Sequence, residues 1–203
     1  MNDLYTVVMH DVKNQLAELA LRLRKRGDAQ QEMTIAMNAF RRLTEMLLLQ
    51  RDDGEQLWVN ADSVNPADFL EMLASEYTEL FPDISIQLDV ERAPACAFFD
   101  DALVRMALGN ALHNACRHAR ARVQLAAFER SNMLVLEVCD DGTGFPESLL
   151  STGGKSPAAT SVAGTGLGLY LAHKIAGLHK LQDQCGYIEL SNLSGGQFRM
   201  VLP

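Results

Sequence analysis

Two glycine-rich clusters stand in the second half of the chain. The first, Asp140–Phe145, reads DDGTGF and follows an apolar segment with strand character; the second, Gly164–Leu169, reads GTGLGL and precedes a helical segment. Glycines let the backbone approach a ligand closely, and a helix N-terminus attracts anions. An acidic turn and an anion-binding turn, joined by a run of small residues, predict a nucleotide site with the base at one end and the phosphates at the other.

The spacing of these glycines excludes two common nucleotide motifs. The dinucleotide fingerprint requires G-x-G-x-x-G, whereas the second cluster gives G-x-G-x-G. The segment Gly154–Ser156 matches the end of a P-loop, but the earlier glycine would fall at Leu149. The order D-x-G-x-G before G-x-G-x-G-L instead resembles the two glycine boxes of the Bergerat-fold ATPases, which include gyrase, MutL, the large heat-shock chaperones and the histidine kinases.

Composition narrows the class of protein. The 203 residues suffice for one domain or a small pair, and a net charge of −8 argues against a nucleic-acid binder, which would show a basic stripe. The four cysteines form no C-x-x-C pair, so neither a zinc site nor a redox motif is indicated. No apolar run approaches the ~18 residues of a membrane span. We therefore expect a cytoplasmic chain without a membrane segment.

The first 55 residues show heptad spacing in two successive segments. The apolar positions are Tyr5, Met9, Val12, Leu16, Leu19 and Leu23, then Met33, Ala36, Phe40, Leu43 and Leu47. This pattern predicts an antiparallel helical hairpin. Because a lone hairpin buries too little apolar surface to be stable, we expect a homodimer in which two hairpins form a four-helix bundle.

His10 lies beside this apolar seam, among the polar residues of the sequence MHDVKNQ. It is either an ordinary exposed histidine or a nucleophile that Asp11 orients and makes more basic. The sequence resembles the H-box of sensor histidine kinases. The resemblance implies that His10 accepts the phosphoryl group, that Asp11 is its acidic neighbour, and that Asn14 helps to place water for removing phosphate from the partner. The chain departs from the family pattern at Gln15, where proline is usual.

Residues 56–203 alternate helical and extended patterns. Helices are expected at 68–80, 102–119 and 169–179, and strands at 84–90, 123–128, 134–139, 187–192 and 197–202. We expect the linker near residues 52–64 to act as a hinge. Helices with antiparallel strand pairs predict an α/β sandwich, so the chain as a whole is α+β, with a helical hairpin followed by a sandwich of the Bergerat ATPase type.

The central expected helix carries Asn110 and Asn114, which are four residues apart and so share one face. This face is either a solvated helix surface or a ligand surface. It resembles the N-box of histidine kinases, and the resemblance implies that Asn114 holds Mg²⁺ through its amide oxygen. It also implies that Asn110 and Arg117 lie near the phosphates and His118 near the sugar or base.

The same resemblance assigns roles within the glycine boxes. Asp140 would accept the adenine amino group, and Gly142 and Gly144 would give the base room. Residues 146–163 would form an ATP lid with Lys155 as a candidate phosphate contact. The triphosphate would be lined by the second box, namely Gly164, Thr165, Gly166, Leu167 and Gly168.

The sequence therefore predicts the catalytic core of a sensor histidine kinase. Residues 1–55 would dimerise and carry the phosphoacceptor, and residues 56–203 would bind ATP and Mg²⁺. The phosphoryl group would pass from ATP to His10 and then to an aspartate on the receiver domain of a response regulator. Two alternatives stay open: a histidine phosphotransfer or phosphatase protein whose ATP-binding-like domain is not catalytic, and an ATPase or serine kinase of the anti-sigma type.

Overall fold

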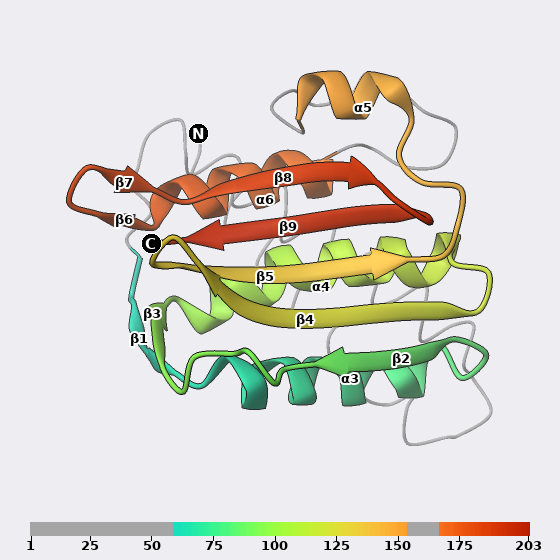
Figure 1. The fold of residues 1–203 in the computed structure, drawn as a ribbon, viewed down its shortest axis with the longest axis horizontal. Helices are drawn as coiled ribbons and strands as arrows, with labels where there is room; N and C mark the ends of the chain where they lie inside the picture. The colour runs from blue at the N-terminus through green and yellow to red at the C-terminus, as the bar shows by residue number, and fades with distance from the viewer. Residues whose placement is uncertain (1–58, 154–166) are drawn as a thin grey trace, which may run out of the picture. The chain divides into compact units, whose positions relative to one another are not determined.

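The computed structural model describes residues 59–153 and 167–203 (Figure 1). The chain divides into two units, residues 1–57 and 58–203, and the description concerns the second. The predicted helical hairpin and several predicted site residues lie outside the described residues: His10, Asp11, Asn14, Lys155, Gly164, Thr165 and Gly166. The expected homodimer and the domain boundary at residue 55 stay predictions.

Five strands form one mixed sheet in the order β2, β4, β5, β9, β8 (Figure 1). They are β2 (Ser85–Asp89), β4 (Arg122–Arg130), β5 (Met133–Asp140), β8 (Tyr187–Asn192) and β9 (Gly196–Leu202). The last four pair antiparallel, as predicted, but β2 runs parallel to β4, so the prediction of antiparallel pairs alone is wrong at this edge. Parallel neighbours need a crossover, and helix α4 (Asp101–His118) lies between them in the chain.

Three helices cover one face of this sheet: α3 (Pro66–Leu80), α4 and α6 (Leu167–Leu178) (Figure 1). Two of them begin at capping side chains. Asn65 accepts hydrogen bonds from the second and third residues of α3, and Asp100 accepts one from Leu103 N at 3.0 Å. The predicted two-layer arrangement of helices on a sheet is confirmed for the described part of the chain.

The core lies between the helices and the sheet. Alternate residues of the strands, such as Leu125, Leu136 and Met200, are fully buried, and so are Leu108 and Leu112 of α4. Burying each such side chain contributes about 1.5–3 kcal/mol. The period of two in the strands and of about 3.6 in the helix therefore fixes which face of α4 packs inward and which remains for a ligand.

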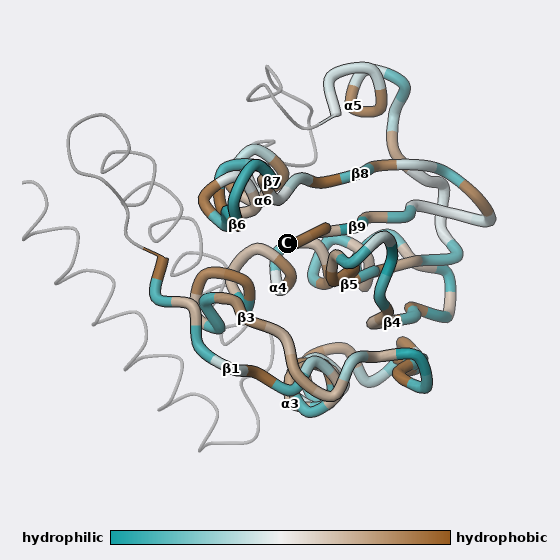
Figure 2. Tube along the Cα trace, turned by 60° about the vertical axis from the view of Figure 1, so that its left-hand side comes forward, coloured by the Kyte–Doolittle hydropathy of each residue, from teal (hydrophilic) through white to brown (hydrophobic). Residues whose placement is uncertain are grey.

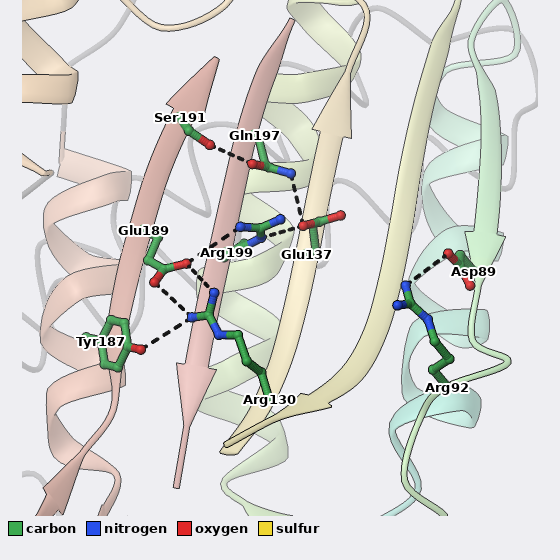
Figure 3. Close-up of polar contacts among 9 residues, drawn as sticks. All are labelled: Asp89, Arg92, Arg130, Glu137, Tyr187, Glu189, Ser191, Gln197 and Arg199. Carbon is green, nitrogen blue, oxygen red and sulfur yellow. Dashed lines mark hydrogen bonds and ion pairs between the residues drawn. The ribbon is translucent and has the colours of Figure 1, made fainter. Parts of the chain in front are cut away.

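The other face of the sheet carries a network of polar side chains (Figure 3). Glu189, Arg199 and Glu137 stand side by side on β8, β9 and β5, because the strand register pairs them directly. Arg199 bonds Glu137, and Arg130 forms a two-pronged ion pair with Glu189. Opposite charges on neighbouring strands stabilise the sheet. Val135, which shares a face of β5 with Glu137 because it lies two residues before it, is fully buried.

The domain also contains several short elements that the sequence did not predict. Strands β1 (Asp62–Val64) and β3 (Ala97–Phe99) pair antiparallel, as do β6 (Lys180–Leu181) and β7 (Gln184–Cys185). Helix α5 (Glu147–Thr152) stands at the edge of the domain beside β8, apart from the other helices (Figures 1 and 2). Within residues 59–153 and 167–203, no helix combines the length and apolar character that crossing a bilayer requires.

The predicted hinge is wrong in its last residues. β1 occupies residues 62–64, and Asn60 N donates to Asp100 Oδ2 at 3.0 Å, which ties the incoming chain to the start of α4.

The loop between β4 and β5 is shorter than the sequence predicted. It is a two-residue turn at Ser131 and Asn132, with φ values of 54° and 60°, as expected for a tight hairpin turn.

His179 is buried and hydrogen-bonded at both ring nitrogens. Its Nε2 accepts from Asp100 N at 3.1 Å, so the ring is neutral and Nδ1 donates to Ile175 O at 2.9 Å. The imidazole thus joins the end of α6 to the cap of α4.

We expect His179→Leu to lower the free energy of unfolding by about 1–3 kcal/mol, because Asp100 N–H would be buried without an acceptor. Thermal unfolding of the full chain would measure this loss. Lys180→Ala, at the exposed neighbouring residue, is the matched control and should have little effect. Equal melting temperatures for His179→Leu and the wild type would show that this hydrogen bond contributes nothing to stability.

Candidate functional site

Asn110 is a buried amide on α4 that lacks hydrogen-bond partners. Its side chain is 3% exposed, and among the described residues neither Oδ1 nor Nδ2 is bonded. Leaving a buried polar group unpaired costs about 1–3 kcal/mol, so such groups usually mark a site that a ligand or another segment completes. Gly168 of the second glycine box lies beside it, since a Cβ at Gly168 would be 3.7 Å from Asn110 Nδ2.

The other predicted residues of α4 follow toward the C-terminal end of the helix. Asn114, Arg117 and His118 are all exposed, and Asn114 shares a face with Asn110 because it lies one turn further on. An exposed amide oxygen is a ligand type that Mg²⁺ accepts in combination with phosphate oxygens. The residue types present therefore fit a magnesium ion bound largely by its nucleotide.

Asp140, the last residue of β5, is held through one carboxylate oxygen. Its Oδ1 accepts hydrogen bonds from Gly142 N at 2.7 Å and from Gly196 N at 3.2 Å. No described residue donates to Oδ2. The carboxylate is therefore fixed in direction and keeps one oxygen for a ligand that donates a hydrogen bond, as an exocyclic amino group does.

Gly142 brings the first glycine turn against the end of α4. A Cβ at this position would lie 2.1 Å from His118 O, a clash with backbone that no side chain can relieve. Gly144 has φ of +79°, where a residue with a Cβ is strained. The structure thus brings Asp140 and Gly142 together with His118, and Gly168 together with Asn110. These two groups lie about 12 Å apart along α4, given a rise of 1.5 Å per residue.

Three residues of the β8–β9 turn belong to this site and were missed from the sequence, namely Asn192, Gly195 and Gly196. Gly195 packs so closely that a Cβ there would be 2.2 Å from Asp140 O, and Gly196 donates to the Asp140 carboxylate. The expected strands at 187–192 and 197–202 implied a turn between them. Nothing in the sequence showed that the turn meets Asp140, because that contact depends on the pairing of β5 with β9.

The neighbouring Asp141 supports the turn from the other side. Its Oδ1 accepts hydrogen bonds from Arg120 N, Ala121 N and Arg122 N at 2.8–3.2 Å. These bonds, above all that from Ala121, lower the pKa of the Asp141 carboxyl.

Cys116 lies on α4, two residues from Asn114, and its pKa is shifted in the opposite direction. Burial and then the charge of Asp140 raise its pKa to about 12, so it stays a neutral packing residue.

Residues 99–203, just over half of the chain, match the family described as histidine kinase-, DNA gyrase B-, and HSP90-like ATPase. The chain belongs to this family. The predicted Bergerat-type fold is thereby confirmed for the described domain, and the domain is of the ATP-binding kind.

Two relatives are sensor kinases. The chain is 30% identical over 143 residues to the sensor protein kinase PmrB of Pseudomonas aeruginosa, covering 68% of this chain and 30% of PmrB. It is 29% identical over 196 residues to the sensor histidine kinase HprS of Escherichia coli, covering 88% of this chain and 41% of HprS. The chain thus spans less than half the length of these curated relatives.

Solved structures of histidine kinases share the fold of this ATPase-family domain. The ATP-binding domain of PrrB from Mycobacterium tuberculosis is 27% identical, with a TM-score of 0.56 over 71% of this chain and 97% of that domain. The histidine kinase AdeS of Acinetobacter baumannii is 17% identical, with a TM-score of 0.66 over 93% of this chain and 95% of its own. At 17% identity, the likeness to AdeS shows the fold alone.

The lowered pKa of Asp141 predicts a pH-dependent contribution to stability. A carboxyl whose pKa is lower in the folded state stabilises above its unfolded pKa of about 3.9, and this stabilisation is lost as the pH falls through the folded value. Asp141→Asn keeps an acceptor but removes the charge. We expect its melting temperature to lie below that of the wild type at pH 7 and the gap to close below about pH 4. A gap that is constant from pH 7 to pH 3 would contradict this account.

Proposed function

We propose that the chain is the catalytic part of an ATP-dependent protein-histidine kinase. The observation that carries the proposal is the Asp140 carboxylate, which is fixed through Oδ1 and offers Oδ2 at the glycine turn of an ATP-binding domain. The relatives PmrB and HprS, both described as sensor kinases, support the choice of a histidine kinase over other members of the ATPase family.

In this proposal each end of the site binds one end of ATP. The free oxygen of Asp140 accepts the adenine amino group, and Gly142 and Gly144 leave room for the base. Asn110 and Arg117 bind phosphate oxygens, and His118 contacts the sugar or base. The remaining contacts to the triphosphate come from Lys155, Gly164, Thr165, Gly166, Leu167 and Gly168.

Asn114 would hold Mg²⁺ through its amide oxygen. The bound ion supplies charge neutralisation at the phosphates. The unpaired amide of Asn110 fits the same end of the site, because its donor and acceptor gain partners there.

The reaction is an in-line transfer of the γ-phosphoryl group to His10. A ring nitrogen of His10 forms a bond to the γ-phosphorus as the bond from that phosphorus to the bridging oxygen breaks, and ADP leaves with that oxygen. Asp11 stabilises the positive charge that the imidazole gains, and positioning with charge neutralisation supplies most of the catalysis. The phosphoryl group then passes to an aspartate of a response regulator receiver domain, and Asn14 places water for its removal from that partner.

We further propose that the chain acts as a homodimer in the cytoplasm, where ATP is available. The dimer rests on the heptad pattern of the first 55 residues, since two hairpins can bury the apolar seams that one leaves exposed.

We expect His10→Gln to abolish incorporation of label from γ-labelled ATP, because glutamine has no nucleophilic ring nitrogen, and to leave ATP affinity unchanged. Incubation with labelled ATP and Mg²⁺, followed by acid and base treatment, measures both the amount and the type of phosphoprotein. The wild-type product should be acid-labile. Label retained in His10→Gln would move the phosphoacceptor elsewhere, and an acid-stable product would favour a serine kinase.

Asp140→Asn tests the pocket itself. The variant keeps Oδ1 for the two backbone N–H groups but replaces the free oxygen by an amide that donates. We expect ATP affinity to fall about 10- to 100-fold, because a charge-assisted hydrogen bond is lost.

Asn114→Ala should weaken ATP binding in the presence of Mg²⁺ more than in its absence, because the amide oxygen proposed to hold the ion is removed.

Calorimetric titration of the full chain with ATP would measure these affinities. Asp89→Ala is the control, because it removes a carboxylate that pairs only weakly with Arg92, at 3.8 Å, on the edge strand β2. Unchanged affinity in Asp140→Asn would mean that the pocket lies elsewhere.

A further inference from the structure

Asn192, the last residue of β8, bonds both main-chain groups of Phe145. Its Oδ1 accepts from Phe145 N at 2.8 Å, and its Nδ2 donates to Phe145 O at 2.9 Å. One side-chain amide thus does for Phe145 what a neighbouring strand would do. Phe145 ends the first glycine box, five residues after Asp140.

The glycine turn is packed directly against this amide. A Cβ at Gly144 would lie 2.6 Å from Asn192 Oδ1, and φ of Gly144 is +79°. The ring of Phe145 lies near Gly196, since a Cβ at Gly196 would be 3.3 Å from Phe145 Cε2 and 2.7 Å from Asp140 Oδ2. The amide of Asn192 therefore holds a residue whose ring, like the free oxygen of Asp140, lies next to Gly196.

Little else in the described part of the chain holds the segment that leaves this turn. Helix α5, which begins two residues after Phe145, has no buried residue. Its N-cap, Pro146, makes no side-chain hydrogen bond. The two hydrogen bonds of Asn192 are consequently a main restraint on the exit of the chain from the turn.

We propose that Asn192 is a positioning residue for the base end of the nucleotide site. Its hydrogen bonds fix Phe145 and thereby keep the Gly142–Gly144 turn in place. The turn then holds the Asp140 carboxylate in the direction that accepts the base. The inference rests on the proposed binding of adenine at Asp140. It adds a residue from β8 whose effect on the nucleotide is indirect.

A role at the base end has a specific signature. Because Asn192 would act at the base end of the site and not at the phosphates, its loss should weaken binding of ADP and of ATP by the same factor. It should also narrow the preference for ATP over GTP, since guanine carries an oxygen where adenine carries its amino group and a well-placed carboxylate rejects it. A residue that only stabilises the hairpin would leave the preference for ATP over GTP unchanged.

The test compares Asn192→Ala, Asn192→Asp and Ser191→Ala in the full chain. Ser191→Ala is the matched control, because it removes one side-chain hydrogen bond, to Gln197 at 2.6 Å, in the same β8–β9 hairpin without touching Phe145. Titration with ADP, ATP and GTP gives the affinities, and thermal unfolding reports on the fold. We expect Asn192→Ala to lose about 5- to 10-fold in affinity for ADP and ATP alike, as for two neutral hydrogen bonds.

Asn192→Asp keeps the acceptor for Phe145 N and loses the donor, so its affinity should fall between the wild type and Asn192→Ala. It also gives a readout if Asn192→Ala does not fold. Affinities equal to those of Ser191→Ala, or a loss seen with ATP but not with ADP, would overturn the inference. If Asp140→Asn binds normally, the proposed site fails; if Asp140→Asn binds weakly while both Asn192 variants bind normally, only the role of Asn192 falls.

Discussion

The hydrogen bonds that two backbone N–H groups donate to Oδ1 of Asp140 are the interaction on which the candidate site depends. One comes from Gly142 in the turn after β5 and one from Gly196 at the start of β9. A carboxylate bonded in this way cannot rotate freely, so its second oxygen points in a defined direction before any ligand arrives. Preorganisation of this kind lowers the cost of binding, because the ordering is already present in the protein.

This arrangement explains why the site is rich in glycine. The donors reach Asp140 only because the turns approach within distances at which a Cβ would meet backbone: 2.1 Å at Gly142 and 2.2 Å at Gly195. Two segments separated by about fifty residues are thus pressed against one carboxylate, and the antiparallel pairing of β5 with β9 sets their alignment. The glycines are therefore required by this close packing as well as by the room that a ligand needs.

The sequence predicted the parts of the site whose signals are local. The acidic glycine turn after β5 and the period of the strands depend on neighbouring residues, and the structure has the turn and the strands where the sequence predicted them. The parts that were missed depend on contacts across the fold. The parallel edge strand β2, the hydrogen bonds of Asn192 to Phe145 and the buried hydrogen bonds of His179 depend on which elements meet, and no spacing within the sequence reveals that.

Helix α4 joins these local and distant features. At its start, the Asp100 carboxylate caps the helix and also accepts a hydrogen bond from Asn60 N, while Asp100 N donates to the His179 ring. The point where the chain enters the domain is thus bonded to the helix. At its end, His118 O abuts the turn at Gly142. Because an α-helix of 18 residues is a stiff rod about 27 Å long, the two contacts are held at a fixed separation. The same rigid element therefore meets the entering chain at one end, carries Asn110 in its middle, and abuts at its other end the turn that holds Asp140.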